Sequence, residues 1–330
     1  MVKILVTGGA GYIGSQMTDL LVQRGHEVIV LDNLSTGFRD AVLNAELIVG
    51  DFGDKNLLDD LFRNHKFDAV MHFAAFIEVK ESVQDPTKYY QNNVVNSLNL
   101  LDAMVKHDVN NLIFSSSAAV YGEPEYVPLN EPHPQKPINP YGRSKVIIEE
   151  ILSDYDKAYG LKSISLRYFN AAGADPKARL GPRHEPASHL IPLVLQAASG
   201  RKQAINIFGT DYSTPDGTCI RDYIHVVDLC DAHLLALEGL FGGGKTDVYN
   251  LGNGNGFSVL SVIETAKEVT GRFIRAVKCE RRPGDPAVLV ADAKKAQQKL
   301  KWKPQFSQLE TIIKHAWQWE LQQEGIQQRA

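Results

Sequence analysis

Cysteine is scarce in this chain, with only Cys219, Cys230 and Cys279 among 330 residues. The three are widely spaced and form no CxxC pair, so the spacing typical of a disulfide framework or a zinc site is missing. The sequence also lacks an HExxH motif. We therefore expect a reducing compartment, three cysteines that serve in packing, and no metal.

Long apolar runs and a strong excess of one charge are also missing. No apolar run approaches the roughly 20 residues that span a bilayer. The first strand-like run begins at Lys3, which leaves no room for a secretory signal peptide. A net charge of -4 gives no general attraction to nucleic acid or acidic membranes. These features predict a cytoplasmic protein that binds neither nucleic acid nor a membrane.

Short apolar runs alternate with helical patterns along the first half of the chain. The strand-like runs cover residues 3–6, 27–31, 47–49, 69–73, 111–114 and 163–166. Helical patterns cover residues 56–65, 85–107 and 141–159. Such alternation is typical of a parallel sheet with helices on both faces. We predict an α/β fold with a Rossmann-type doubly wound parallel sheet.

A glycine-rich turn, TGGAGYIG, joins the first strand-like run to a helical pattern and contains Gly8, Gly11 and Gly14. Because glycine has no Cβ, the backbone can approach a pyrophosphate closely, and the helix N-terminus supplies N–H groups and a positive dipole end. This context predicts a dinucleotide-binding turn.

An acidic residue, Asp32, ends the second strand-like run 18 residues after Gly14. Its carboxylate is suited to accept hydrogen bonds from the adenosine ribose and would repel the 2′-phosphate of NADP. We therefore expect NAD as the cofactor. The alternative is a surface aspartate that only closes the strand.

The second half of the chain is interrupted by segments rich in glycine, proline and charge, at residues 174–186, 209–217, 242–244, 252–256 and 281–286. Such segments are loops, and loops on a rigid scaffold often carry binding residues. We expect residues 1–170 to form an NAD-binding domain, to which a segment near residues 226–251 returns. Residues 171–330 should form a second, smaller α+β domain that binds the substrate.

Tyr141 and Lys145 are four residues apart in a segment with strong helix signals: Asn139 as N-cap, Pro140 at the first helical position and Gly160 beyond the end. They should share one helix face. An ammonium near the phenol, together with a positively charged oxidised nicotinamide, would lower the tyrosine pKa and make it a usable base. The alternative is a packed ring beside a lysine that reaches solvent.

Three serines, Ser115, Ser116 and Ser117, follow the strand-like run at residues 111–114. Ligands of open α/β folds bind at the carboxyl ends of the strands. We expect these hydroxyls to face the cleft and to hydrogen bond the substrate hydroxyl that Tyr141 deprotonates. An ordinary turn at the strand end is the alternative.

The chain resembles the extended short-chain dehydrogenase/reductases along nearly its whole length. Within them it resembles the UDP-glucose 4-epimerase (UDP-galactose 4-epimerase) family. The matching segments are TGGAGYIG, HFAA (72–75), SSSAAVYG (115–122), PYGRSK (140–145), RYFNAAG (167–173), DGTCIRDYIHVVDL (216–229), YNLGNG (249–254) and RRPGD (281–285). The first four mark the superfamily and the last four mark the epimerases.

The resemblance implies a homodimeric isomerase that interconverts UDP-galactose and UDP-glucose with tightly bound NAD. Tyr141 would take the C4 hydroxyl proton, Lys145 and Ser117 would complete the catalytic group, and hydride would pass to NAD and return to the other face of a 4-keto intermediate. By the same resemblance, the UDP-sugar lies on residues 171–330.

The resemblance also assigns binding residues. Those implied for NAD are Gly8, Gly11, Tyr12, Ile13, Gly14, Asp32, Asn33, Asp51, Phe52, Phe73, Ala74, Ala75, Asn92, Ser115, Tyr141, Lys145 and Tyr168. Those implied for the substrate are Ser117, Tyr141, Asn170, His189, Leu190, Asn206, Ile207, Phe208, Arg221, Arg282, Asp285 and Leu289.

Alternatives remain for several of these residues. Arg221 could instead form an ion pair with Asp222 or Asp228, and Arg282 and Asp285 could lie in a solvated loop. His225 is expected to be a hydrogen-bonded structural residue.

Two departures from the family pattern concern Ile77, where some members have a lysine, and Ala119, where a hydroxyl residue is common. Leu289 leaves open whether N-acetylated UDP-hexoses are accepted, because it is of intermediate size at a position that lines the sugar pocket.

Two other activities share part of this pattern. Nucleotide-sugar 4,6-dehydratases need an Asp-Glu pair after the serine or threonine, where this chain has Ala118 and Ala119. A regulatory protein that senses NAD without turnover would usually lose Tyr141 or Lys145. The sequence therefore favours the epimerase.

Replacing the acidic residue that ends the second strand tests the preference for NAD. We expect Asp32→Ala to weaken the discrimination against NADP, because no carboxylate then repels the 2′-phosphate. Titration calorimetry with NAD and with NADP would measure it. An unchanged preference for NAD would assign the discrimination to another residue.

Overall fold

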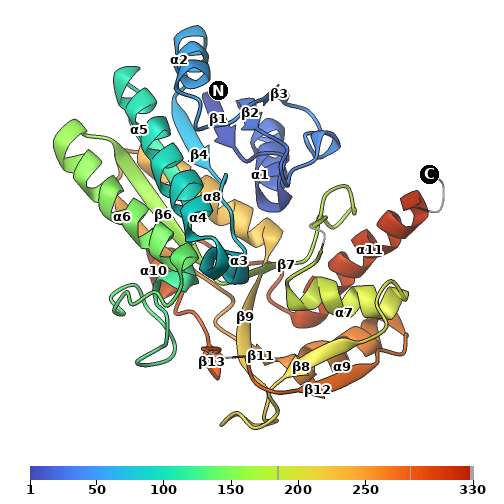
Figure 1. Ribbon diagram of the computed structural model, residues 1–330. Helices are drawn as coiled ribbons and strands as arrows, with labels where there is room; N and C mark the ends of the chain where they lie inside the picture. Colours follow the sequence, from blue (N-terminus) through green and yellow to red (C-terminus); the bar gives the residue numbers. More distant parts are fainter. Residues whose placement is uncertain (184–185, 283, 328–330) are drawn as a thin grey trace.

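A seven-stranded parallel sheet organises the larger lobe of the computed structural model, which describes residues 1–183, 186–282 and 284–327 (Figure 1). Across the sheet the strands run in the order β10 (Asp247–Leu251), β6 (Lys162–Tyr168), β5 (Asn111–Ser117), β4 (Ala69–His72), β1 (Lys3–Thr7), β2 (Glu27–Asp32), β3 (Glu46–Val49). The predicted Rossmann-type fold is confirmed. The strand order reverses between β1 and β4, where such sheets bind ligands.

Helices cover both faces of this sheet (Figure 1). One face packs against α1 (Tyr12–Gln23), α8 (Val226–Phe241) and α10 (Lys294–Lys299). The other packs against α2 (Lys55–Asn64), α5 (Asn96–Lys106) and α6 (Pro140–Tyr159). Short pieces complete the lobe: α3 (Val79–Gln84), α4 (Pro86–Tyr90) and the 3-10 turns Arg39–Ala41 and Ala118–Val120.

Helix α6 begins and ends where the sequence predicts. The Asn139 side chain accepts a hydrogen bond from the Gly142 N–H at 2.8 Å, and Pro140 occupies the first turn. The helix ends at Gly160, whose φ of 75° suits a residue without Cβ. These caps fix the position of the two residues expected to carry chemistry, Tyr141 and Lys145.

The single helix expected over residues 85–107 is instead broken. Helix α4 passes into a π-helical turn, Gln91–Val95, before α5 continues. A π turn inserts an extra residue into the helical repeat and therefore rotates the side chains that follow it. In this turn Asn93 is buried and faces α6, where its Nδ2 donates to Ser144 Oγ at 3.2 Å.

A smaller lobe follows β6 and is built around two short sheets (Figure 1). In one sheet β9 (Ile220–His225) pairs with β7 (Asn170–Ala172), β11 (Gly256–Ser258) and β13 (Val288–Leu289); in the other β8 (Ile205–Phe208) pairs with β12 (Ala276–Cys279). Its core packs against the helices α7 (Leu190–Ser199), α9 (Val259–Thr270) and α11 (Leu309–Gln327).

The chain crosses between the lobes more than once. After β9, helix α8 packs on the large sheet and β10 adds to its edge beside β6, so residues 226–251 lie within the larger lobe. The chain then re-enters the smaller lobe at β11. Among the described residues, no helix is long and apolar enough to cross a membrane.

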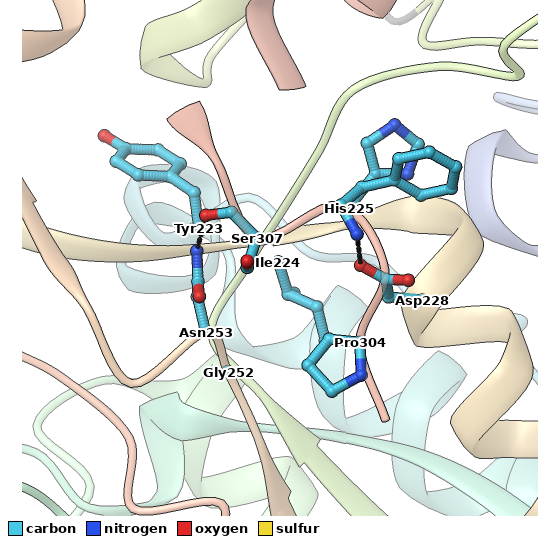
Figure 2. Close-up of a pocket in the computed structure, with 9 residues that line it drawn as sticks. Tyr223, Ile224, His225, Asp228, Gly252, Asn253, Pro304 and Ser307 are labelled. Carbon is cyan, nitrogen blue, oxygen red and sulfur yellow. Dashed lines mark hydrogen bonds between the residues drawn. The ribbon is translucent and has the colours of Figure 1, made fainter. Parts of the chain in front are cut away.

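Asp228, near the start of α8, ties the lobes together through a narrow pocket (Figure 2). Its carboxylate accepts hydrogen bonds from the backbone N–H groups of Gln305 at 2.7 Å and Phe306 at 2.9 Å, and its carbonyl accepts from Trp302 Nε1 at 2.9 Å. The same pocket holds His225, whose Nδ1 accepts from the Val227 N–H at 3.1 Å and caps α8. The structural role expected for His225 is confirmed.

Removing the Asp228 carboxylate tests this connection. We expect Asp228→Ala to lower the free energy of unfolding by about 2–4 kcal/mol, because two part-buried N–H groups lose a charged acceptor. Thermal denaturation of the variant would measure the loss. Asp154→Ala is the control, since Asp154 pairs with Lys157 at the exposed surface of α6 and such pairs contribute little. Equal melting temperatures for both variants would show that the Asp228 carboxylate does not stabilise the connection between the lobes.

Candidate active site

The residues expected to hold a dinucleotide lie along one edge of the large sheet. Gly8 follows β1, Asp32 ends β2, Asp51 follows β3, Phe73 follows β4 and Tyr168 ends β6. Because all seven strands are parallel, their carboxyl ends meet at this edge. Residues far apart in the sequence are thereby brought to one site.

Two glycines of the turn are needed by the protein itself. Gly8 has a φ of 73°, and a Cβ there would lie 2.5 Å from the Ala74 nitrogen. A Cβ on Gly14 would lie 2.2 Å from the Gly8 carbonyl oxygen. Both clashes are with backbone, which cannot move away cheaply. These glycines therefore hold the turn closely against the start of α1 and against the chain after β4.

Gly11 differs, because nothing in the protein requires it to be glycine. Its φ is -82°, and an added Cβ would meet only the Gly8 oxygen, at an ordinary 3.4 Å. Gly11 is the N-cap of α1 and supplies no side chain to the N–H groups of the first turn. The missing Cβ leaves room for an external group at a helix N-terminus, where phosphates bind. The turn therefore fits the pyrophosphate of a dinucleotide.

Asp32 is buried and orders the loops around it. Its Oδ2 accepts from the Ala10 N–H at 2.9 Å, and its Oδ1 accepts from the Leu34 N–H at 2.8 Å. The amide of Asn33 donates to Asp51 Oδ2 at 2.9 Å, so the ends of β2 and β3 are joined. Asp32 is thus more than a surface residue that closes a strand, because it also fixes the glycine-rich turn.

Phe52 is placed differently from the other residues expected near the adenine. Its side chain is only 5% exposed and packs in the core, with its ring centroid 5.1 Å from that of His72. Its ring is therefore unsuited to contact a ligand, which leaves its backbone groups at the sheet edge.

The structure brings Ser117, the last residue of β5, together with Tyr141 and Lys145, which lie in the first turns of α6. Lys145 Nζ donates to the Ser115 carbonyl at 2.8 Å and lies 5.9 Å from the centre of the Tyr141 ring. The Ser117 hydroxyl lies close enough to the Tyr141 phenol to favour its ionised form. The Ser117 Oγ also accepts from the Ala119 N–H at 3.1 Å, which fixes the serine rotamer. The expected serine, tyrosine and lysine group is therefore assembled.

Burial controls the electrostatics of this group. It lowers the pKa of Lys145 to about 7, against a smaller opposing effect of Glu149. It also raises the pKa of Tyr141, and the Ser117 hydrogen bond opposes this rise only in part. Lys145 on its own therefore does not offset the burial of Tyr141, and the sequence interpretation relied on the lysine together with a positively charged nicotinamide. A further positive charge at the site is required to make Tyr141 a base at neutral pH.

The serines do not all face the cleft as expected, because β5 extends through Ser117. Side chains of a strand alternate between its faces. Ser116 therefore lies on the opposite face from its neighbours, where its hydroxyl donates to Glu149 at 2.5 Å, and Glu149 forms an ion pair with Arg167. Ser116 belongs to this buried network and not to the site.

In the smaller lobe Arg221 forms an ion pair with Asp285, across β9 and the loop before β13. Neither alternative partner is engaged. The Asp222 carboxylate accepts from the N–H groups of Asn253, Gly254 and Ala291, and Asp228 holds the loop described above. Arg221 and Asp285 are thus a part-buried pair of opposite charges, with the arginine only 12% exposed.

An aromatic ring and a second arginine lie near this pair. The Arg282 guanidinium lies 3.9 Å from the centre of the Phe208 ring, a cation–π contact. Asn206 is exposed on the same side of β8 as Phe208. Ile207 points the other way, into the core, and is 3% exposed. The burial of the Ile207 side chain leaves only its backbone groups for the substrate contact expected from the sequence. Leu289 lies opposite Arg221 in the β13–β9 pair.

Several other expected residues already have partners in the protein. The Tyr12 hydroxyl donates to the Gly173 carbonyl at 2.7 Å, and Asn170 Nδ2 donates to the Asp222 carbonyl at 2.8 Å. Asn92 Nδ2 donates to its neighbour Asn93 at 2.9 Å. His189 is the N-cap residue of α7, and Leu190 is the first residue of that helix. Ile13 lies at the end of the glycine-rich turn and Ala75 follows β4, and both are partly buried.

Sequence reasoning missed Asn93, although it named its neighbour. Asn93 Oδ1 accepts from the Phe76 N–H at 2.9 Å, and Nδ2 donates to the Phe76 carbonyl at 2.9 Å and to Ser144 beside Tyr141. It therefore joins the loop after β4 to helix α6. No periodic signal could have found it, because the π turn changes which residues face inward.

The fold and site define a dinucleotide-dependent enzyme with a serine, tyrosine and lysine group. Residues 4–252 match the NAD dependent epimerase/dehydratase family, and the chain belongs to that family.

Relatives and solved structures agree along almost the whole chain. A UDP-glucose 4-epimerase of Halalkalibacterium halodurans is 52% identical over 316 residues, which cover 96% of this chain and 95% of that protein. The crystal structure of the Brucella ovis UDP-glucose 4-epimerase in complex with NAD has a TM-score of 0.94 and 47% identity, with 96% of this chain and 98% of that one covered.

A third solved structure is also similar to this chain. The UDP-glucose 4-epimerase of Bifidobacterium longum, solved with NAD+ and UDP, is 37% identical and has a TM-score of 0.91, covering 98% of this chain and 99% of that one.

A methyl group at Gly11 tests the assignment of the turn. We expect Gly11→Ala to leave the melting temperature of the cofactor-free protein unchanged within about 2 °C, because the added Cβ meets no close protein atom. NAD binding, measured by calorimetry, should weaken at least tenfold. Gly14→Ala is the opposite case and should destabilise the fold, because of its 2.2 Å contact. Unchanged NAD affinity in Gly11→Ala would contradict the assignment.

Proposed function

We propose that this chain is an NAD-dependent epimerase that interconverts UDP-galactose and UDP-glucose. The observation that carries the proposal is the convergence of Ser117, Tyr141 and Lys145 at the sheet edge that also holds the glycine-rich turn. The similarity to UDP-glucose 4-epimerases at 52% identity over nearly the whole chain supports the same reaction.

The cofactor of the proposed reaction is NAD, held by the edge of the large sheet. The Gly11 backbone would face the pyrophosphate, and Asp32 would accept from the adenosine ribose. Asp32 already accepts two backbone N–H groups, so it is held in place before the ribose arrives. When bound in its oxidised form, NAD supplies a hydride acceptor and a positive charge.

Tyr141 would act as the base that takes the proton of the C4 hydroxyl. Ser117 would orient that hydroxyl, since its own hydroxyl lies near the Tyr141 phenol and is held by the Ala119 N–H. Lys145, held by the Ser115 carbonyl, would stabilise the phenolate. Tyr141 would then return the proton to C4–O after the sugar has turned over within the pocket, so the chain itself is unchanged at the end of each cycle.

The UDP part of the substrate would lie on the smaller lobe. Arg221 and Arg282 are suited to a diphosphate, because a guanidinium offers paired donors and a permanent charge. Asp285 would accept from ribose hydroxyls, and Phe208 offers an aromatic face for uracil. Arg282 covers that ring in this structure, so uracil binding on Phe208 would require the guanidinium to move aside.

Activity on N-acetylated UDP-hexoses is a second candidate, and it rests on Leu289. This side chain is half-buried against Val120, Tyr121 and Leu129 and would border the sugar. A Campylobacter jejuni UDP-Glc/GlcNAc 4-epimerase is 46% identical to this chain. Loss of a branched side chain at Leu289 would enlarge this part of the pocket.

A homodimer in the cytoplasm completes the proposal. Exposed apolar side chains occur on α3 and in the π turn, with Val79 46%, Val83 62% and Val95 42% exposed, and exposed apolar surface can mark an interface. Three free cysteines suit a reducing compartment. We further propose that residues 1–170 with 226–251 bind NAD and that the rest of the chain binds UDP.

Removing the phenol tests the proposed base. We expect Tyr141→Phe to reduce the turnover of UDP-galactose by about 10²–10⁴-fold, because the proton acceptor is lost while the ring remains. The NAD content of the purified protein should stay the same. Tyr159→Phe, an exposed tyrosine on the same helix, is the control and should turn over normally. Turnover of Tyr141→Phe within a few-fold of the unaltered enzyme would refute the role.

A further inference from the structure

We propose that His233 is a positioning residue for the reaction. From helix α8 it holds the end of β5, and with it the Ser115 carbonyl to which Lys145 donates a hydrogen bond. This inference rests on the proposed function. His233 lies on α8, on the face that packs against the large sheet, and none of its side chain is exposed. His233 acts through its contacts with Ser115 and Phe73 and not on the reacting atoms themselves.

The hydrogen bonds of His233 define which ring nitrogen carries the proton. Nδ1 lies 2.8 Å from the carbonyl oxygen of Leu229, one helical turn earlier, and a carbonyl can only accept. Nδ1 is therefore protonated. Burial lowers the pKa of His233 to about 4, so the ring is neutral at pH 7 and Nε2 carries a free lone pair.

That lone pair faces the serine whose carbonyl holds Lys145. His233 Nε2 lies 3.4 Å from Ser115 Oγ, and because Nε2 has no proton the serine must donate. Ser115 Oγ can then accept from the Tyr168 hydroxyl, which lies 3.4 Å away. The chain of donors thus runs in one direction, from Tyr168 through Ser115 and His233 to the Leu229 carbonyl.

This chain fixes Ser115 at both its side chain and its backbone. Its carbonyl accepts from Lys145 Nζ at 2.8 Å, so any shift of Ser115 moves the ammonium relative to Tyr141. The His233 ring also stacks on Phe73, with centroids 5.0 Å apart and planes at 29°. Phe73 begins the segment that follows β4 at the cofactor edge. One buried ring therefore supports three parts of the site that come from different strands.

Apolar replacement of the ring is the first test. We expect His233→Leu to lower kcat about tenfold or more with little change in the KM for UDP-galactose, since small displacements at a reacting centre are costly while the UDP contacts are remote. His233→Gln, which can again offer an acceptor to Ser115, should recover part of the rate. Leu237→Ala, a core cavity one turn along the same helix, is the control for lost stability and should keep its kcat at 25 °C.

A double-mutant cycle separates positioning from general destabilisation. Because His233 acts through the Ser115 hydroxyl, Ser115→Ala and His233→Leu should each lower kcat, and the double variant should be no slower than the slower single variant. Effects that multiply, or a His233→Leu enzyme within twofold of the unaltered kcat, would overturn the inference.

A spectroscopic readout keeps this test independent of turnover. In the ¹⁵N-histidine-labelled holoenzyme at pH 7, His233 should show a protonated Nδ1 and an unprotonated Nε2, and Ser115→Ala should shift the Nε2 resonance. The reverse tautomer would overturn the inference even in an active enzyme. The predicted tautomer in a protein that does not act on UDP-galactose would leave the geometry intact and contradict only the proposed substrate.

Discussion

The hydrogen bond from the Lys145 ammonium to the Ser115 carbonyl joins the two elements on which the site is built. It holds helix α6 against the end of β5, with Lys145 4% exposed and its nitrogen 4.8 Å from the centre of the Phe114 ring. A charge in such surroundings is costly, and the lowered pKa of Lys145 records that cost. The caps of α6 and the buried hydrogen bonds of Asn93 and His233 keep the lysine in place.

The same burial explains why a cofactor belongs in the site. Burial raises the pKa of Tyr141 and lowers that of Lys145, so in the protein alone each side chain becomes charged less readily than it does in water. A bound cation beside the phenol would reverse this effect for the tyrosine. The base would then be active only when oxidised NAD is present, which couples proton removal to hydride transfer.

The two lobes are held together by two aspartate carboxylates that accept hydrogen bonds from backbone N–H groups. Asp222 and Asp228 flank the junction between β9 and α8, and each accepts backbone N–H groups from segments that follow much later in the chain. The junction therefore has a fixed geometry. A sugar bound through the smaller lobe can be placed against a nicotinamide bound on the larger one.

Much of this arrangement can be predicted from local sequence signals. The glycine-rich turn, the strand alternation and the caps of α6 are encoded within a few residues each, and they place Tyr141 and Lys145 correctly. Features that depend on tertiary contacts cannot be predicted in this way. The π turn at Gln91–Val95, the burial of Ser116 on the opposite face of β5, the buried side chain of Ile207 and the support from His233 cannot be read from local patterns. All depend on which elements pack together.

In the proposed reaction, hydride leaves C4 of the sugar and returns to it within one protein that keeps its own NAD. This is tested by incubating the purified protein, without added NAD, with UDP-galactose deuterated at C4 and analysing the UDP-glucose formed by mass spectrometry and NMR. We expect UDP-glucose that retains deuterium at C4 and that forms more slowly than from the unlabelled sugar. Exchange of the C4 deuterium with solvent would show that C4 loses a proton, which would rule out hydride transfer.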